Sequence, residues 1–193
     1  MYEADLKDIE SFVTDQVFKL CLRTSAKERP MSCLWVRKWK GDEVKSRLCV
    51  RGFLDHQKKH VSKYSSTATR LSQRLACSIT VENSFDMEQW DIGNAFLKGF
   101  SFSVMRRMCQ LFGIAVPDVE RQVTILAPGN VWYTLGEFGF YSHGHRAIFM
   151  YALELLKAMH GLVDAPDLWS IAFRYFIIKE LGGRPSRYDE NYV

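Results

Sequence analysis

Residues 89–96 read Gln-Trp-Asp-Ile-Gly-Asn-Ala-Phe, and this stretch decides which fold and which chemistry the sequence predicts. Asp91 ends an apolar, strand-like approach, a Gly-Asn pair then turns the chain, and a helix is predicted to begin at Ala95. A carboxylate at the tip of a strand, followed five residues later by the aromatic Phe96, suits a metal ion and a nucleotide sugar. The alternative, from these residues alone, is a buried strand that ends in the N-cap region of a helix.

A second block, residues 45–53, reads Lys-Ser-Arg-Leu-Cys-Val-Arg-Gly-Phe and alternates in the manner of a strand. Residues 34–39 alternate in the same way, and a Lys-Gly-Asp-Glu turn joins the two, so a β-hairpin is predicted over about residues 34–53. Lys45 and Arg47 lie two apart on the second strand and therefore project from one face. A point charge beside a guanidinium suits a triphosphate, while the alternative is a solvated strand face.

The charge of the chain is segregated along the sequence. Residues 19–74 contain 15 Lys and Arg against four acidic residues, a net charge of +11, whereas the whole chain carries only +4. The remainder therefore carries −7. A basic segment of this kind is the electrostatic footprint of a polyanionic partner, and the alternative is a solvated charged face.

Length and composition bound the class of protein. The 193 residues are 47% hydrophobic, enough for one core or for a core with a smaller lobe. No apolar run approaches the roughly 20 residues of a membrane span, and the first ten residues are acidic and polar, unlike a signal peptide. The five cysteines form no Cys-x-x-Cys pair, which indicates reduced thiols. We therefore expect an intracellular protein without a membrane partner.

The remaining elements can be placed coarsely. Apolar residues at helical spacing predict helices within residues 5–20, 69–79 and 151–162, and a further helix begins near Pro166. Residues 101–151 are predicted as loops with one short strand at positions 123 to 126. Strands mixed with helices, without regular alternation, predict an α+β fold.

Four blocks occur in a fixed order: residues 34–40, 45–53, 89–99 and 156–169. The first resembles Lys-Trp-Val-x-x-x-Lys and the second Lys-Ala-Arg-Leu-Val-Ala-Lys-Gly-Phe. The third resembles Gln-Leu-Asp-Val-Lys-Thr-Ala-Phe-Leu-Asn-Gly and the fourth Leu-Lys-Ala-Leu-Tyr-Gly-Leu-Lys-Gln-Ala-Pro-Arg-x-Trp. On these blocks the chain resembles the N-terminal part of the reverse transcriptase (RNA-directed DNA polymerase) domain of copia-type retrotransposon polyproteins.

The resemblance implies a fragment of a right-hand polymerase, with fingers and an incomplete palm sheet. Residues 1–85 would form a fingers-like lobe that contains the hairpin. Residues 86–193 would form a partial palm with an irregular, divergent insertion at about residues 100–150.

The resemblance also implies roles for particular residues. Asp91 would be a catalytic carboxylate and a ligand to magnesium or manganese, and Phe96 would lie beneath the nucleotide sugar. The implied nucleotide-binding residues are Lys45, Arg47, Ile92, Ala95 and Phe96. The implied contacts to nucleic acid are Arg51, Arg70 and Arg74, and such contacts are salt-sensitive.

The sequence departs from the family pattern at important positions. It contains no Asp-Asp pair, so the Tyr-x-Asp-Asp element that completes the metal site in the family is absent from these residues. Asp164 replaces a glutamine near the nucleotide, and a carboxylate there would repel a triphosphate unless it belongs to a helix N-cap region. Val163 and Asp167 replace basic residues. We therefore expect the 193 residues alone not to polymerise.

The function implied is RNA-directed DNA synthesis during retrotransposition. The partners would be an RNA or DNA primer–template, deoxynucleotide triphosphates and the remaining polyprotein domains, in a cytoplasmic virus-like particle or in the nucleus. One alternative is a non-catalytic nucleic-acid-binding remnant of a transposon. Another is a transposon fossil that does not fold stably, because an incomplete palm leaves sheet edges unpaired.

Overall fold

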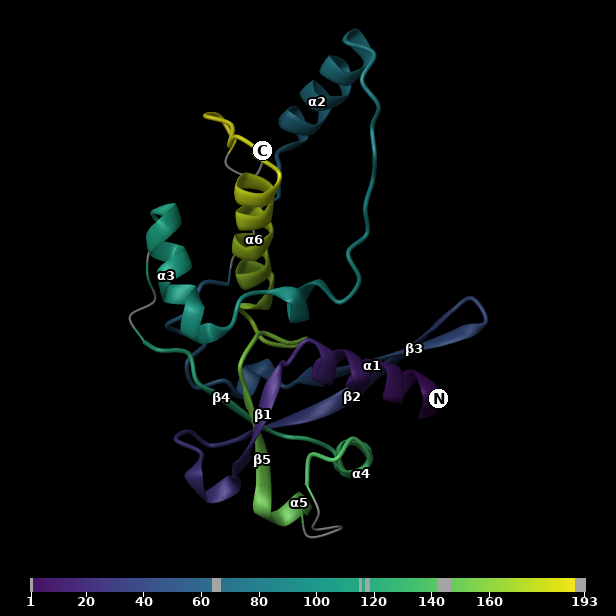
Figure 1. The fold of residues 1–193 in the computed structure, drawn as a ribbon, viewed down its shortest axis with the longest axis vertical. Coiled ribbons are helices and arrows are strands. Elements are labelled where there is room, and N and C mark those ends of the chain that lie inside the picture. The colour runs from purple at the N-terminus through teal and green to yellow at the C-terminus, as the bar shows by residue number, and fades with distance from the viewer. Residues whose placement is uncertain (1, 64–66, 115, 117–118, 142–146, 190–193) are drawn as a thin grey trace.

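The computed structural model describes residues 2–63, 67–114, 116, 119–141 and 147–189. The fold combines helices with one five-stranded mixed sheet, whose strands follow the order β1-β5-β4-β2-β3 (Figure 1). The predicted α+β class is confirmed at this level. Among the described residues, no helix has the length and apolar character needed to cross a membrane.

The predicted hairpin is present. Strands β2 (Met31–Lys40) and β3 (Glu43–Val50) pair antiparallel from Cys33 opposite Val50 to Lys40 opposite Glu43, and Gly41 supplies the positive φ of +65° that the turn requires. Along β3 the side chains alternate between buried and exposed, so one face packs on the body and the other is open.

The other three strands come from segments far apart in the sequence. β1 (Phe18–Leu22) and β4 (Val123–Leu126) both pair antiparallel with β5 (Tyr151–Leu155), and β4 pairs parallel with β2. Both predicted lobes therefore contribute strands to one sheet. The strand β4 is where the sequence predicted it.

The helix predicted within residues 5–20 is present, but it ends at Thr14, before β1. The helix predicted over residues 151–162 is wrong, because β5 occupies the first part of this stretch. β1 and β5 pair residue for residue, and β5 buries Ala152, Leu153 and Leu155. The stabilisation from this strand pairing and burial outweighs the tendency to form a helix that the spacing of the apolar residues indicates.

Helix α1 (Tyr2–Thr14) lies against β3 and buries Ile9 and Phe12 in the core. The stretch predicted as loops contains, besides its strand, the helices α3 (Phe102–Phe112) and α4 (Gly129–Glu137) and the short α5 (Ala147–Met150) near its end, and Trp132 of α4 is fully buried. Glycine and proline at the ends of these helices, and not within a loop, explain the wrong prediction.

Helix α6 (Ala165–Tyr175) begins near Pro166 as predicted and continues in a π-helical turn, Phe176–Glu180. Helix α2 (Arg70–Glu82) agrees with the predicted helix, but it stands away from the body and buries none of its side chains (Figure 1). The short helical elements are η1 (Arg23–Ser25), η2 (Gly52–Leu54), η3 (Ala95–Lys98) and α5 (Ala147–Met150).

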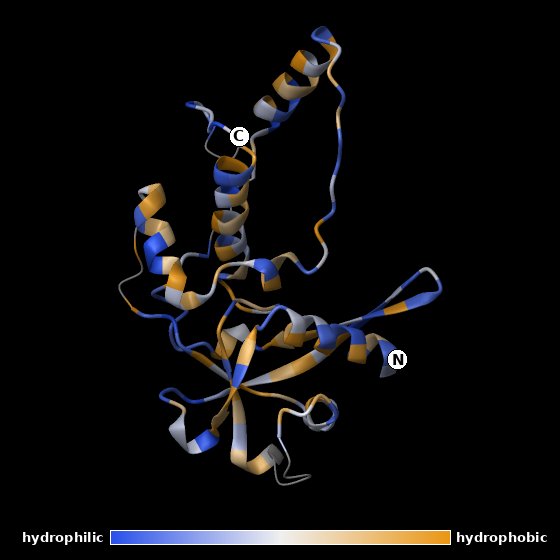
Figure 2. Cartoon of the chain, in the orientation of Figure 1, coloured by the Kyte–Doolittle hydropathy of each residue, from blue (hydrophilic) through white to orange (hydrophobic). Residues whose placement is uncertain are grey.

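The approach to Asp91 is not a strand. Residues 83–92 run from α2 to η3 without regular secondary structure, and all side chains from residue 83 to Asp91 are exposed, including the apolar Phe85, Met87 and Trp90 (Figures 1 and 2). No strand among the described residues pairs with this segment. An apolar, alternating sequence forms a strand only where a neighbouring strand takes up its backbone hydrogen bonds.

Candidate nucleotide and nucleic-acid site

The second and fourth sequence blocks meet at a tight backbone crossing. The Val50 amide, at the end of β3, donates a hydrogen bond to the carbonyl of His160 over 2.8 Å. A Cβ on Gly52 would collide with the carbonyl of Gly161, and a Cβ on Gly161 would collide with that of Val50. Only glycine allows this close approach at either position. The backbone of each block therefore explains why the other block has a glycine there.

The third block joins the same place through an aromatic contact. The Phe96 ring, on η3, meets the His160 ring edge-on with 5.4 Å between centroids. His160 is only 8% exposed, and its Nε2 has no hydrogen-bond partner among the described residues. Burial lowers the pKa of His160, and the positive charge of Arg47 lowers it further, so the imidazole is neutral at pH 7.

His160 was missed in the sequence analysis. Its position is within the fourth block, where the family pattern has tyrosine, and that substitution was the available signal. The structure thus brings Arg47, Phe96 and His160 together from three blocks. Ile92 and Ala95 lie next to this group along the chain and are half-buried.

Lys45 and Arg47 lie on the open face of β3 and are exposed, whereas Ser46 and Leu48 between and beyond them are buried. Lys38 on β2 stands directly opposite Lys45. Like charges opposite one another in a sheet repel, and a bound phosphate relieves that repulsion. The open face of the hairpin therefore carries the three cations Lys38, Lys45 and Arg47.

Two carboxylates of α1 hold the hairpin from its other face. Asp5 accepts hydrogen bonds from the Arg37 guanidinium (2.7 and 3.0 Å) and from the Ser46 hydroxyl (2.5 Å), while Asp8 accepts the Leu48 amide (2.7 Å). Burial raises the pKa of Asp8 to about 6, although the bond from Leu48 acts in the opposite direction. Burial alone would also raise the pKa of Asp5, but the bonds from Arg37 and Ser46 bring it below its usual value.

Asp91 is exposed on the irregular segment before η3. Within the described residues, no three His, Cys, Asp or Glu side chains gather closely enough to hold a metal ion. Two divalent ions need several oxygen ligands, so one exposed carboxylate does not make such a site. Magnesium or manganese was expected only in a complete domain that supplies further carboxylates, and that expectation stays a prediction.

The basic residues predicted to contact nucleic acid are divided between two places. Arg51 follows β3 directly and is exposed, and its backbone amide donates to Ser32 (3.0 Å). Arg70 and Arg74 are exposed on α2, the helix that projects from the body. The structure does not gather these three residues into one patch with the hairpin.

A buried ion-pair cluster lies beneath the loop that follows the hairpin. The Arg121 guanidinium binds Asp164 through two hydrogen bonds (2.8 and 3.1 Å), Asp55 through two more (2.5 and 3.0 Å), and Gln57 through a fifth (3.2 Å). Asp164 does occupy the N-cap position of α6, but its carboxylate makes no capping bond and is turned to Arg121. Its negative charge is thus compensated. No sequence signal pointed to Arg121, which lies in the stretch predicted as loops.

Comparison of the chain with protein-family models, with curated proteins and with solved structures finds no match.

Proposed function

We propose that the chain is a portion of a reverse transcriptase domain of the copia type, and that it contacts a primer–template and a deoxynucleotide triphosphate. The observation that carries the proposal is the convergence of three sequence blocks at one place. Residues 45–53, 89–99 and 156–169 are far apart in the sequence, yet they meet at the Val50–His160 bond and the Phe96–His160 contact.

The chemistry of the neighbouring side chains supports the same proposal. Lys45 and Arg47 on the open hairpin face offer a point charge and a planar donor fork to phosphate oxygens. Phe96 offers a flat apolar surface to a sugar, and a neutral His160 behind it adds no charge that would compete for the phosphates. The Asp164 carboxylate is bound by Arg121, which reduces its repulsion of a triphosphate.

The proposal does not include a catalytic step for these residues alone. Only Asp91 corresponds to a metal ligand of the family, and paired aspartates are absent from the sequence. Asp91 would contribute to catalysis together with further carboxylates.

A second candidate function is nucleic-acid binding without catalysis. The observation that favours it is the basic open face of the hairpin, where Lys38 and Lys45 face each other and neither belongs to an ion pair of the described residues. This function requires duplex binding but no nucleotide binding.

The first test is the affinity of the chain for a fluorescent RNA–DNA primer–template, measured by anisotropy over a range of salt concentrations. The double variant Lys45→Gln/Arg47→Gln should lower the affinity about tenfold or more, and it should reduce the slope of log K against log salt by about 1.5, because two phosphate contacts are lost. A matched control removes two exposed cations at the far end of α6, Lys179→Gln/Arg184→Gln, and should leave the slope unchanged. Equal effects of the two double variants would overturn the assignment of the hairpin face.

The second test separates the two functions. A deoxynucleotide triphosphate complementary to the template should bind the preformed complex, and Phe96→Ala should weaken that binding without changing the affinity for the duplex. A ribonucleotide triphosphate should bind more weakly than its deoxy counterpart to the parent chain and equally to the variant. Duplex binding without any nucleotide binding would favour the binding remnant.

A further inference from the structure

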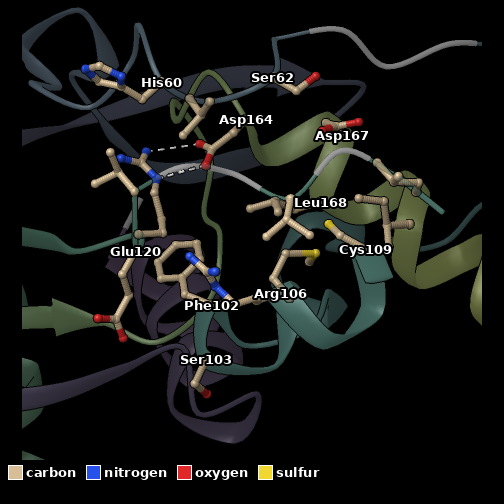
Figure 3. Close-up of a pocket in the computed structure, with 17 residues that line it drawn as sticks. His60, Ser62, Phe102, Ser103, Arg106, Cys109, Glu120, Asp164, Asp167 and Leu168 are labelled. Carbon is tan, nitrogen blue, oxygen red and sulfur yellow. Dashed lines mark hydrogen bonds and ion pairs between the residues drawn. The ribbon is translucent and has the colours of Figure 1, made fainter. Parts of the chain in front are cut away.

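A cavity of about 640 Å³ lies between α3 and α6, and Asp164 and Asp167 of the fourth sequence block are among the residues that line it (Figure 3). Pockets that hold small organic molecules have volumes of about 300 to 1,000 Å³, so the cavity is large enough for one. Arg47, Phe96 and His160 are not among the residues that line it. The cavity and the proposed nucleotide site are therefore distinct.

The two long walls of the cavity are apolar. Helix α3 contributes Phe102, Met105 and Cys109, and helix α6 contributes Leu168 and Ile171 from the other side. Side chains of this kind bury a ring or an alkyl body by the hydrophobic effect.

The polar end of the cavity carries an excess of negative charge. All five N–H donors of Arg121 are occupied by Asp55, Asp164 and Gln57, so this guanidinium has none left for a ligand. One cation thus compensates two carboxylates, and a third carboxylate, Asp167, lies one helical turn beyond Asp164.

Asp167 is half-buried at the N-terminal turn of α6, and the ion pairs of the described residues do not include it. Burial raises its pKa, a hydrogen bond from Ser62 lowers it, and the nearby charge of Asp164 raises it further. The positive end of the helix offsets only a small part of the cost of such a charge. Arg106 and Glu120 also line the cavity, and because their charges are opposite they leave its net charge unchanged (Figure 3).

We propose that this cavity binds a small organic amine, with its apolar body between α3 and α6 and its ammonium group against the Asp167 carboxylate. The chemical class follows from the two features together: an apolar slot selects a ring or alkyl body, and the uncompensated carboxylate at its end selects a cation over an anion. This binding activity goes beyond the proposed function.

Calorimetric titration of the chain with three probes of one ring system tests the proposal. Tryptamine carries an ammonium, indole carries no charge, and indole-3-acetate carries a carboxylate. Tryptamine should bind at least tenfold more tightly than indole, and indole-3-acetate should bind most weakly. Equal affinities for tryptamine and indole-3-acetate, or no binding of tryptamine, would overturn the proposal.

A charge variant locates the ammonium. Asp167→Asn keeps the size of the side chain and should lower the affinity for tryptamine about tenfold while leaving the affinity for indole within twofold. The matched control Glu120→Gln removes an exposed carboxylate that also lines the cavity and should change neither affinity. An equal loss of tryptamine binding in both variants would mean that general surface charge, and not Asp167, attracts the amine.

The thiol of Cys109 reports occupancy without relying on a variant. Cys109 lines the cavity, whereas Cys33 is a buried thiol elsewhere in the core. Saturating tryptamine should slow the alkylation of Cys109 by iodoacetamide, followed by peptide mass spectrometry, more than that of Cys33. Equal slowing of both thiols would indicate only global stabilisation and would contradict binding in this cavity.

Discussion

At the scale of single residues, Asp8 is held by the fold in an environment that disfavours its charge. Its pKa of about 6 lies above its ordinary value of 3.8. The folded state holds the Asp8 proton more tightly than the unfolded state. The contribution of this proton to the stability of the fold is therefore complete below about pH 4 and is lost as the pH rises through 6. We therefore expect Asp8→Asn to raise the free energy of unfolding at pH 7 by about 2 kcal/mol, because the amide oxygen still accepts the Leu48 bond without a buried charge.

Urea unfolding at pH 4.5 and pH 7 measures this effect, and the gain should be several-fold smaller at the lower pH. Glu10→Gln, which removes an exposed charge from the same helix, should leave stability unchanged at both values. A gain from Asp8→Asn that is equal at the two pH values would contradict the assignment of the effect to ionisation.

His160 shows the opposite linkage. Burial, with a further contribution from Arg47, lowers its pKa below 6.5, so the unfolded state binds the proton more tightly and the stability is lost as the pH falls below about 6.5. We expect Arg47→Gln to raise the pKa of His160 toward 6.5, and NMR titration of the imidazole resonance measures it. The control Arg51→Gln removes an exposed charge that does not contribute to the pKa shift of His160. It should leave the pKa of His160 unchanged. No change with Arg47→Gln would mean that Arg47 does not act on His160.

At the scale of elements, the crossing of β3 with the loop before α6 depends on glycine. Gly161 has a φ of +96°, and a Cβ there would strike the backbone of Val50. Gly161→Ala should therefore destabilise the fold by roughly 2–4 kcal/mol, from backbone strain together with the collision. Gly41→Ala is the matched control, because Gly41 also has a positive φ (+65°) but nothing within 4 Å of a Cβ, so it should cost only about 1 kcal/mol. Equal losses in thermal unfolding would show that the crossing is not tight.

The elements that the sequence predicted well are those fixed by local chemistry. The hairpin follows from alternation and a Gly-Asp turn, and α6 follows from Pro166 near its start. The helix predicted in place of β5 was wrong because this segment is a strand only through its pairing with β1 and β4 on either side. No local sequence pattern indicates such pairing. The strand predicted before Asp91 was wrong for the converse reason. Its sequence is strand-like, but no described strand pairs with it.

In the candidate site, too, the sequence predicted the features that depend on local structure and missed those that depend on long-range contacts. The shared face of Lys45 and Arg47 follows from the period of a strand, so the sequence was sufficient for it. The contact of Phe96 with His160, and the compensation of Asp164 by Arg121, join segments at least 43 residues apart and needed the fold. Long-range ion pairs in particular leave no periodic signal.

At the scale of the whole molecule, the chain divides into a packed body and a projecting limb. The strands β4 and β5 bury most of their residues, whereas α2 buries no side chain and exposes Leu71 and Leu75 (Figure 2). Local opening of an unpacked helix costs little free energy, while a core strand exchanges its amides only on opening close to global unfolding. We therefore expect the amides of α2 to exchange with deuterium at least about 100-fold faster than those of β4 and β5. Hydrogen exchange followed by mass spectrometry measures both in one sample, and α1, which packs on β3, is the internal control for a helix that belongs to the body. Protection of α2 equal to that of α1 would mean that the limb is packed in solution and that its apolar face is covered.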